Sequence, residues 1–410
     1  MPRSETLDAG GARGWGAQAH IEPGLGRIRA LRPADPRDQK TLAARFLGSR
    51  GAARLRRSAE AGRGLLDRDW TQELSAASPI EVGLLCCPRC EGDLAQRDDG
   101  LSCAGCGRTF EIRDGLPMLF WPNEWSGDRP DVTDQVKDFY EETPFPNYQE
   151  FDSVSSLIRK ARQGRFAKLL DDQAPAGARI LECGCGTGQL TNFLSIANRT
   201  VYGVDICVNS LGLGQEFKTA NSLGGAHFLQ MNLFRPALQR ESFDLVISNG
   251  VLHHTSDPYL AFESISRLVK PGGYILVGLY HRYGRLITDF RRVIFGALGD
   301  RLAFLDPNLR HSDASSPRWK AWFMDQYKHP HESKHTIGEV LGWLDRVGFD
   351  FVKSLPRGKP FQPIRSDENL FDPEEPGSTL ERFAVEFAMM FRGSREGGFF
   401  IVIGRRPAAR

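Results

Sequence analysis

Short apolar runs alternate with stretches of helical periodicity between residues 178 and 280. Apolar runs bounded by turn residues predict buried strands, and the stretches between them predict helices. Strands and helices that alternate along a chain predict an α/β fold built on a mostly parallel sheet. The expected strands lie at Ile180–Leu181, Val201–Asp205, His227–Gln230, Phe243–Ser248 and Tyr274–Tyr280. The expected helices include Val154–Leu170, Gln189–Ile196, Tyr259–Val269, Leu286–Leu298 (amphipathic) and Thr336–Val347.

The segment Phe139–Tyr148 interrupts this pattern on the N-terminal side. It holds two prolines and four aromatic residues, and a regular helix does not run through prolines placed so closely. We expect it to pack across the mouth of a ligand site, with Tyr140, Phe145 and Tyr148 facing inward. The alternative is an ordinary packed linker.

The first 80 residues differ from the rest in composition. They carry 14 Arg or Lys residues, 13 of them Arg, against nine acids, with few periodic apolar positions. Such a composition favours a disordered extension, in which only Gln39–Leu66 has the loose spacing of a short basic helix. The alternative is a basic arm that recruits RNA or another partner.

Length and charge limit what the whole chain can be. Its 410 residues leave room for about two to three domains. A formal net charge of +2 argues against a protein that coats nucleic acid over its whole surface. No apolar run is long enough for a transmembrane span, and the N-terminus lacks the apolar core of a signal peptide. With cysteines patterned as metal ligands and buried thiols, these features predict a cytoplasmic location. The oligomeric state stays open.

Four of the eight cysteines form two C-x-x-C pairs. In each pair a tight turn lets two thiolates face one ion, and two pairs complete a tetrahedral Zn(Cys)4 site. The twelve residues between the pairs suffice for a short hairpin. Because four thiolates leave no open coordination position, we expect a structural zinc ion held by Cys87, Cys90, Cys103 and Cys106. The neighbouring Cys86 does not fit the spacing.

The first strand of the central segment ends in an acid, and three glycines follow at alternate positions. Glu182 precedes Gly184, Gly186 and Gly188, and the next helix starts directly afterwards. Such a loop lets the backbone approach a ligand closely, and the helix start offers unpaired N–H groups to an anion. The spacing differs from the G-x-G-x-x-G dinucleotide fingerprint. At the tip of the neighbouring strand, Asp205 is placed to accept hydrogen bonds from both hydroxyls of a ribose.

Four motifs in this order resemble those of class I S-adenosylmethionine-dependent methyltransferases. They are E-x-G-x-G-x-G from Glu182, V-D at Val204–Asp205, F-D-L-V-I-S-x-x-V-L-H-H from Phe243 and L-V-K-P-G-G from Leu268. They are most similar to the branch that holds the ubiquinone and menaquinone biosynthesis methyltransferases. The resemblance covers residues 178–280. It implies a seven-stranded, Rossmann-like sheet that is mostly parallel and has an antiparallel terminal strand.

The resemblance also implies a site for S-adenosylmethionine. Gly184, Gly186 and Gly188 would line its methionine half, Asp205 would bind its ribose, and Asn232 would lie beside its adenine. The rest of the implied site is Glu182, Cys185, Ile206, Leu233 and Asn249.

Two histidines follow the fourth strand, at the sheet edge where ligands bind in open α/β folds. We expect His254, in preference to His253, to act as a base or to orient the methyl acceptor. The alternative is that one histidine packs in the core and the other caps a helix.

The cysteine segment resembles a second family. The patterns Cys87-Pro-x-Cys-x-Gly-x-Leu94 and Cys103-x-x-Cys-x-x-x-Phe110 are similar to the small zinc-ribbon proteins that activate tRNA, rRNA and release-factor methyltransferases. Here the ribbon would be fused in cis. Residues 86–120 hold four Arg and six acids, a poor surface for phosphates, so we expect a brace on the catalytic domain.

These observations divide the chain into six parts. They are a disordered extension (1–80), a zinc ribbon (81–120), an aromatic and proline segment with a lead-in helix (121–177), a methyltransferase core (178–280), a cap insertion (281–335), and terminal elements with a second cap insertion (336–410). An apolar cap favours a small or lipid-like methyl acceptor. The alternative is an RNA or protein acceptor, recruited by the ribbon and the basic arm.

Overall fold

The computed structural model of the chain describes residues 80–408, except residues 98–99, 126–129, 147, 149–152, 299–301, 303, 307–308, 310–315, 366 and 397. The Arg-rich extension and the short helix expected at Gln39–Leu66 lie outside the described residues.

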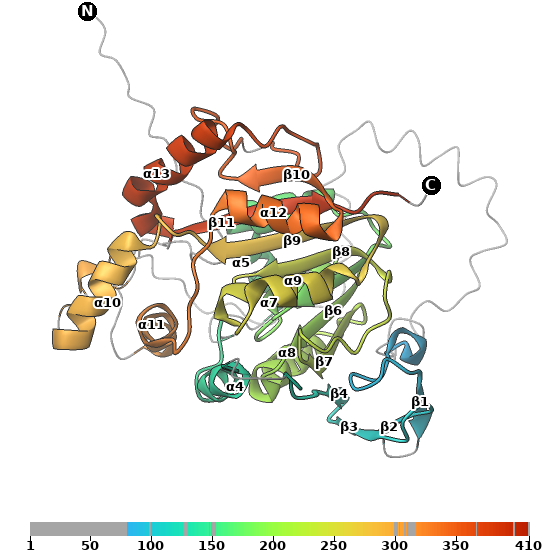
Figure 1. Ribbon diagram of the computed structural model, residues 1–410. Coiled ribbons are helices and arrows are strands. Elements are labelled where there is room, and N and C mark those ends of the chain that lie inside the picture. The colour runs from blue at the N-terminus through green and yellow to red at the C-terminus, as the bar shows by residue number, and fades with distance from the viewer. Residues whose placement is uncertain are drawn as a thin grey trace, which may run out of the picture. The chain divides into compact units, whose positions relative to one another are not determined.

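One sheet runs through the described part of the chain, with strand order β1-β2-β3-β4-β7-β6-β5-β8-β9-β11-β10 (Figure 1). From β7 to β10 it contains the seven expected strands. Of these, only β11 runs antiparallel to its neighbours, β9 and β10. The expected α/β fold with a mostly parallel sheet is therefore confirmed. The seven strands are β5 (Arg179–Cys183), β6 (Thr200–Asp205), β7 (Ala226–Met231), β8 (Phe243–Asn249), β9 (Val269–Tyr280), β10 (Asp350–Leu355) and β11 (Phe399–Arg405).

Helices cover both faces of the sheet, because its central strands are apolar on both sides. On β5, Ile180 packs in a buried cluster with side chains of α5, α6 and α7. The next residue, Leu181, points to the opposite face and packs with side chains of α9 and α12. The covering helices are α5 (Val154–Gln163), α6 (Arg165–Gln173), α7 (Gln189–Ser195), α8 (Val208–Ala220), α9 (Pro258–Ser266) and α12 (Ile337–Val347).

Two elements differ from the sequence expectation. The helix expected over Val154–Leu170 is divided at Gly164, whose backbone is extended with φ −79° and ψ 119°. The segment Lys270–Gly273, expected as a helix stop before a strand, is itself part of β9. The pairing of β8 with β9 shifts register there, between Phe243 and Leu245, which accommodates Pro and Gly in the strand.

The N-terminal hairpins join the same sheet. After the short η2 (Val82–Leu84), the strands β1 (Leu94–Arg97), β2 (Gly100–Cys103), β3 (Thr109–Arg113) and β4 (Leu116–Leu119) pair antiparallel in succession. The strand β4 then pairs parallel with β7, where Met118 lies opposite Gln230 and Leu119 opposite Met231. The side chain of Leu119 is fully buried. The sequence did not predict this pairing, which fixes the cysteine segment to the edge of the central sheet.

The remaining helices lie at one end of the sheet. Next to the end of β9, the helices α10 and α11 pack around a small apolar core of their own that includes Phe295, Trp322 and Tyr327 (Figure 1). Helix α4 ends at Glu142, before the prolines that end helical structure. None of the described helices is both long and apolar enough to cross a membrane. These elements are α4 (Thr133–Glu142), α10 (Leu286–Leu298), α11 (Pro317–Phe323), the π-helix η5 (Met324–Lys328) and α13 (Thr379–Glu396).

Candidate active site

A cavity opens at the carboxyl ends of β5, β6, β7 and β8, where open α/β sheets bind their ligands. Most of the residues predicted from the sequence line it together. They are Tyr140, Phe145, Glu182, Gly184, Cys185, Gly186, Asp205, Ile206, Asn232, Leu233, Asn249 and His254. Three others, Gly188, Tyr148 and His253, are not among its lining residues.

The glycine loop is shaped by contacts within the protein. Gly186 has φ +52°, and a Cβ atom there would lie 2.3 Å from the backbone oxygen of Phe145. Gly188 precedes the first residue of α7 with φ +70°, and a Cβ atom there would lie 2.2 Å from the ring of Phe228. Glycine at both positions is thus required by backbone conformation and close packing. Gly188 is the N-cap residue of α7 and does not line the cavity.

Asp205 is oriented by the glycine loop. Its Oδ2 accepts a hydrogen bond from the N–H of Gly186 at 2.8 Å, and its Oδ1 accepts one from the N–H of Cys207 at 2.9 Å. Burial raises the pKa of Asp205. Each carboxylate oxygen can accept a second hydrogen bond, so the fixed carboxyl group remains able to bind a pair of hydroxyls.

Glu182 lies deeper in the cavity wall and is 8% exposed. Its Oε2 accepts a hydrogen bond from the hydroxyl of Thr191 at 2.5 Å. Burial raises the pKa of Glu182 to about 8. A cation bound next to this carboxyl group would favour its ionised form.

Asn232 connects the cavity to the segment that follows β4. Its Nδ2 donates to the backbone oxygen of Trp121 and to Oδ1 of Asn123, both at 2.9 Å. Its Oδ1 accepts from the N–H of Phe234 at 3.0 Å. Both amide hydrogens are therefore engaged, and only Oδ1 retains capacity for a ligand.

His254 is held as a neutral imidazole. Its Nδ1 lies 2.9 Å from the backbone oxygen of His331, a contact in which Nδ1 must donate. Burial lowers the pKa of His254 to about 4. The ring packs against His329, with 3.7 Å between centroids. The tautomer that this contact selects leaves a lone pair on Nε2, which can accept a proton or a hydrogen bond.

The predicted residues outside the cavity have structural contacts. His253 is fully buried and packs against the ring of Tyr280, with 4.1 Å between centroids. The hydroxyl of Tyr148 accepts a hydrogen bond from Asn192 at 2.9 Å, and its ring stacks on Phe217.

Asp325 and Tyr280 are among the polar residues of the cavity wall that the sequence did not predict. Asp325 comes from the π-helix η5, and Tyr280 ends β9. Asp325 accepts hydrogen bonds from the hydroxyl of Tyr140 and from Nε2 of Gln326, both at 2.9 Å. Gln326 also donates to the hydroxyl oxygen of Tyr280 at 2.7 Å. Burial raises the pKa of Tyr140 and of Tyr280, so both hydroxyls stay protonated.

A buried arginine supports this wall. The side chain of Arg285 is fully buried and pairs with Glu332 at 2.6 Å and with Oε1 of Gln326 at 2.5 Å. Burial alone would raise the pKa of Glu332. The guanidinium groups of Arg285 and Arg292 outweigh burial and lower this pKa to about 2. The network fixes Gln326 and, through it, the positions of Asp325 and Tyr280.

Comparison with known proteins decides the family. A family model described as a methyltransferase domain matches residues 181–277. An uncharacterized protein of Synechococcus is 27% identical over 234 residues, which cover 50% of this chain and 56% of the relative. The ubiquinone biosynthesis O-methyltransferase of Paracidovorax citrulli is 32% identical over 117 residues, which cover 28% of this chain and 48% of the relative. Residues 181–277 of this chain are therefore a methyltransferase domain of the class I S-adenosylmethionine-dependent type.

The chain spans about half the length of the curated relatives named above, 56% and 48%. Among solved structures, the magnesium protoporphyrin IX methyltransferase of Synechocystis matches 67% of this chain and 99% of its own, with 17% identity and a TM-score of 0.40.

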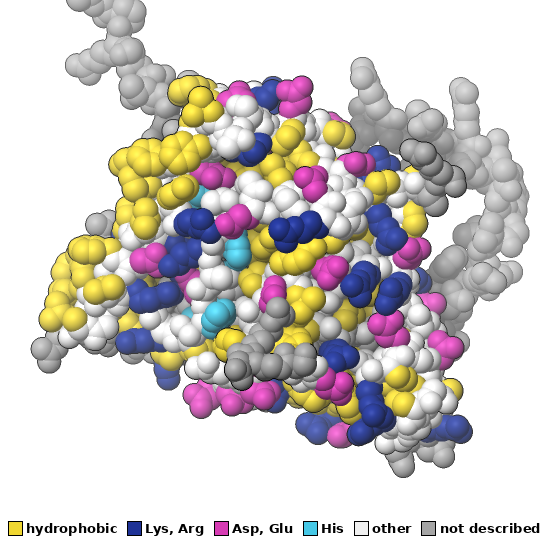
Figure 2. All heavy atoms as spheres, in the orientation of Figure 1, with side chains coloured by type: hydrophobic (Ala, Val, Ile, Leu, Met, Phe, Trp, Pro, Cys, Tyr) yellow, Lys and Arg dark blue, Asp and Glu magenta, His cyan; other side chains and the backbone are white. Residues whose placement is uncertain are grey.

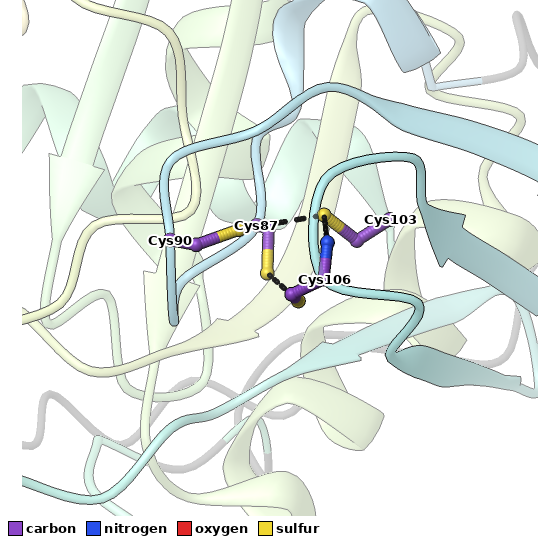
Figure 3. A group of neighbouring side chains, drawn as sticks. All are labelled: Cys87, Cys90, Cys103 and Cys106. Atoms are coloured by element: carbon purple, nitrogen blue, oxygen red, sulfur yellow. Dashed lines mark hydrogen bonds between the residues drawn. The ribbon is translucent and has the colours of Figure 1, made fainter.

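The four predicted cysteines lie in the N-terminal segment that joins the central sheet through β4. Their sulfur atoms all lie within 4.8 Å of one another, and Figure 3 shows them converging from two loops. The sulfurs of Cys87 and Cys106 are 3.7 Å apart, and those of Cys90 and Cys103 are 3.5 Å apart. Tetrahedral zinc with Zn–S bonds of about 2.3 Å requires about 3.8 Å between sulfurs. Cys86 lies outside the cluster, with its thiol directed at the backbone oxygen of Pro236.

Proposed function

We propose that this protein transfers the methyl group of S-adenosylmethionine to a small or lipid-like acceptor. The observation that carries the proposal is a single cavity with two kinds of wall. One wall is the glycine loop with Glu182 and Asp205, and the other holds Tyr140, His254 and Asp325.

The residues of the first wall suit the cofactor. Asp205 is fixed at the tip of β6 by backbone N–H groups, and its carboxylate suits the hydroxyls of a ribose. Glu182 is a buried carboxyl group whose hydrogen-bond donor, Thr191, carries no charge. A carboxylate at this position suits the cationic amino group of the methionine half. Leu233 and Asn232 would flank the adenine. When bound, S-adenosylmethionine supplies an electrophilic methyl group.

The residues of the second wall would position the acceptor. The Nε2 atom of His254 accepts a hydrogen bond from the acceptor and so orients its reacting atom. Where the acceptor is a hydroxyl group, the same nitrogen takes its proton during transfer. Asp325 and the hydroxyl of Tyr140 bind a polar group of the acceptor.

Two observations support a small or lipid-like acceptor. The cavity wall is largely apolar and includes Val136, Phe145 and Phe234. The relative from Paracidovorax citrulli is named a ubiquinone biosynthesis O-methyltransferase. The cysteine segment also has a structural role, because β4 pairs with β7. Its presence is therefore explained without a role in recruiting RNA or protein.

We further propose that the four cysteines hold a zinc ion with a structural role. The donor set fits this ion, because four thiolates at these separations match tetrahedral Zn–S coordination. Full coordination by cysteine leaves no position for a substrate or for water. The ion would therefore stabilise the loops that lead into β1 and β3.

The acceptor class is testable by methyl transfer. Labelled methyl groups from S-adenosylmethionine are followed into fractionated cell extract, before and after treatment with nuclease and protease. We expect the label in the small-molecule or lipid fraction, unchanged by either treatment and by added salt. Label that is lost on nuclease treatment, or transfer that weakens steeply with ionic strength, would instead support the RNA alternative.

A further inference from the structure

Two helices present apolar side chains to solvent. On α10, Leu286, Phe290 and Val293 follow each other at helical spacing and are 45%, 67% and 72% exposed. On α13, exposure runs from 46% to 77% at Leu380, Phe383, Phe387 and Phe391, which again share one side of the helix. A helix of a globular domain usually turns its apolar stripe inward. We call these seven residues the α10/α13 face.

The α10/α13 face is continuous. The helices α10 and α13 lie side by side, and the ring of Phe383 contacts Tyr283, close to the start of α10, with 6.1 Å between centroids. Phe383, Phe387 and Phe391 are spaced 6.1 Å and 6.0 Å apart along α13. Figure 2 shows hydrophobic side chains gathered along the edge of the molecule where Figure 1 places the two helices. Exposed apolar surface of this extent marks an interaction site.

Positive charge borders the face. The insertion 281–335 holds ten Lys or Arg residues against six acids, a net charge of +4, whereas the whole chain has +2. Of the acids that the structure describes there, Asp306 and Asp325 are buried, Glu332 is bound by Arg285, and Asp289 pairs with Lys334.

Among the described residues of this insertion, the exposed unpaired charges next to α10 are therefore cationic. Lys320 on α11 and Lys328 on η5 are exposed, and α10 packs on η5. An apolar face with a basic border is the combination that binds anionic membranes from one side.

We propose that the α10/α13 face docks the protein on an anionic lipid bilayer. A second copy fits the same surface less well, because a two-fold dimer would bring Lys320 and Lys328 of both copies towards each other. The insertion that carries α10 also contributes Asp325 to the cavity. Docking does not depend on the proposed methyl transfer.

The test is flotation of the full chain, without cofactor, with vesicles of phosphatidylcholine alone or mixed with phosphatidylglycerol. We expect binding to the mixed vesicles, and less binding as salt is added. The double variants Phe387→Ser/Phe391→Ser and Phe290→Ser/Val293→Ser each reduce the bound fraction roughly tenfold. The matched control is Phe361→Ser, at a fully exposed position in the loop between β10 and α13, which binds as the unaltered protein does.

Three results would overturn the proposal. One is absence of binding to the mixed vesicles, and another is equal binding by the double variants and the control. The third is a dimer in light scattering that both double variants dissociate, since the face would then belong to a second copy. Equal thermal unfolding midpoints for all variants show that a loss of binding is not a loss of fold. Calorimetry with S-adenosylmethionine reports separately on the proposed function.

Discussion

At the scale of single residues, Glu182 makes cofactor binding depend on pH. With a pKa of about 8, it is mostly protonated at neutral pH in the protein without ligand. The cationic cofactor favours the carboxylate, so binding at pH 7 releases a proton, and affinity rises with pH until about 8 and then levels off. Calorimetry in buffers of different ionisation enthalpy measures the proton release. In Glu182→Gln both effects should disappear.

The same raised pKa has a consequence for stability. Between the usual range of a carboxyl group and pH 8, the folded protein retains a proton on Glu182 that the unfolded chain has released. The contribution of this residue to the free energy of unfolding therefore falls as pH rises through that window.

His254 is expected to act without being charged. Because its pKa is about 4, kcat stays level as the pH is lowered from neutrality towards that value. His254→Ala lowers kcat about 100-fold, the lower end of the range for removal of a proton-accepting group, with the affinity for S-adenosylmethionine unchanged. The control is His227→Gln on β7. His227 is also buried and also has a pKa lowered to about 4, but it does not line the cavity. Equal kcat values for the two variants would remove His254 from the mechanism.

The residue scale also shows where sequence reasoning stopped. The sequence placed Glu182, Gly184, Gly186 and Asp205 at one edge of the sheet, because their motif follows two neighbouring parallel strands, and all four line the cavity. The role of Asp325 in the cavity wall could not be predicted. A π-helix places this residue there, and no local sequence pattern predicts a π-helix. The sequence analysis expected Gly188 to line the ligand. In the structure the ring of Phe228 leaves no room for a Cβ atom at this position, which is a reason for glycine within the protein itself.

At the scale of elements, the cysteine segment supports the cavity wall through β4. The strand β4 pairs with β7, and the segment after it holds Asn232 through Trp121 and Asn123. The sequence predicted the cysteine cluster from spacing alone, but it did not predict the pairing. Backbone hydrogen bonds at a sheet edge do not require particular side chains, so they leave no motif.

Removal of the metal tests this link. Chelation, or Cys106→Ser, should unfold the cysteine loops and loosen β4, and the Kd for S-adenosylmethionine should rise about tenfold as the contacts to Asn232 are lost. Thermal unfolding and calorimetry measure the two effects. The control is Cys86→Ser, whose thiol lies outside the cluster. A loss of methyl transfer at unchanged cofactor affinity and stability would mean that the ion takes part in the chemistry.

At the scale of the whole molecule, insertions around a conventional core shape the acceptor side. The core supplies the glycine loop and Asp205, and the insertion after β9 supplies Asp325 together with the arginine network behind it. The fold of the core was predictable because each strand and helix carries its own hydrophobic period. The arrangement of the insertion was not, because it depends on long-range contacts such as that of Tyr140 with Asp325.

The central claim is that the glycine loop and Asp205 hold S-adenosylmethionine. Titration calorimetry of the full chain tests it most directly, with Asp205→Ala and Gly186→Val as variants and their thermal unfolding as a check of the fold. We predict that the unaltered protein binds this cofactor and that both folded variants fail to bind it. Retained binding in both variants, or binding of a nicotinamide dinucleotide in place of S-adenosylmethionine, would contradict the account.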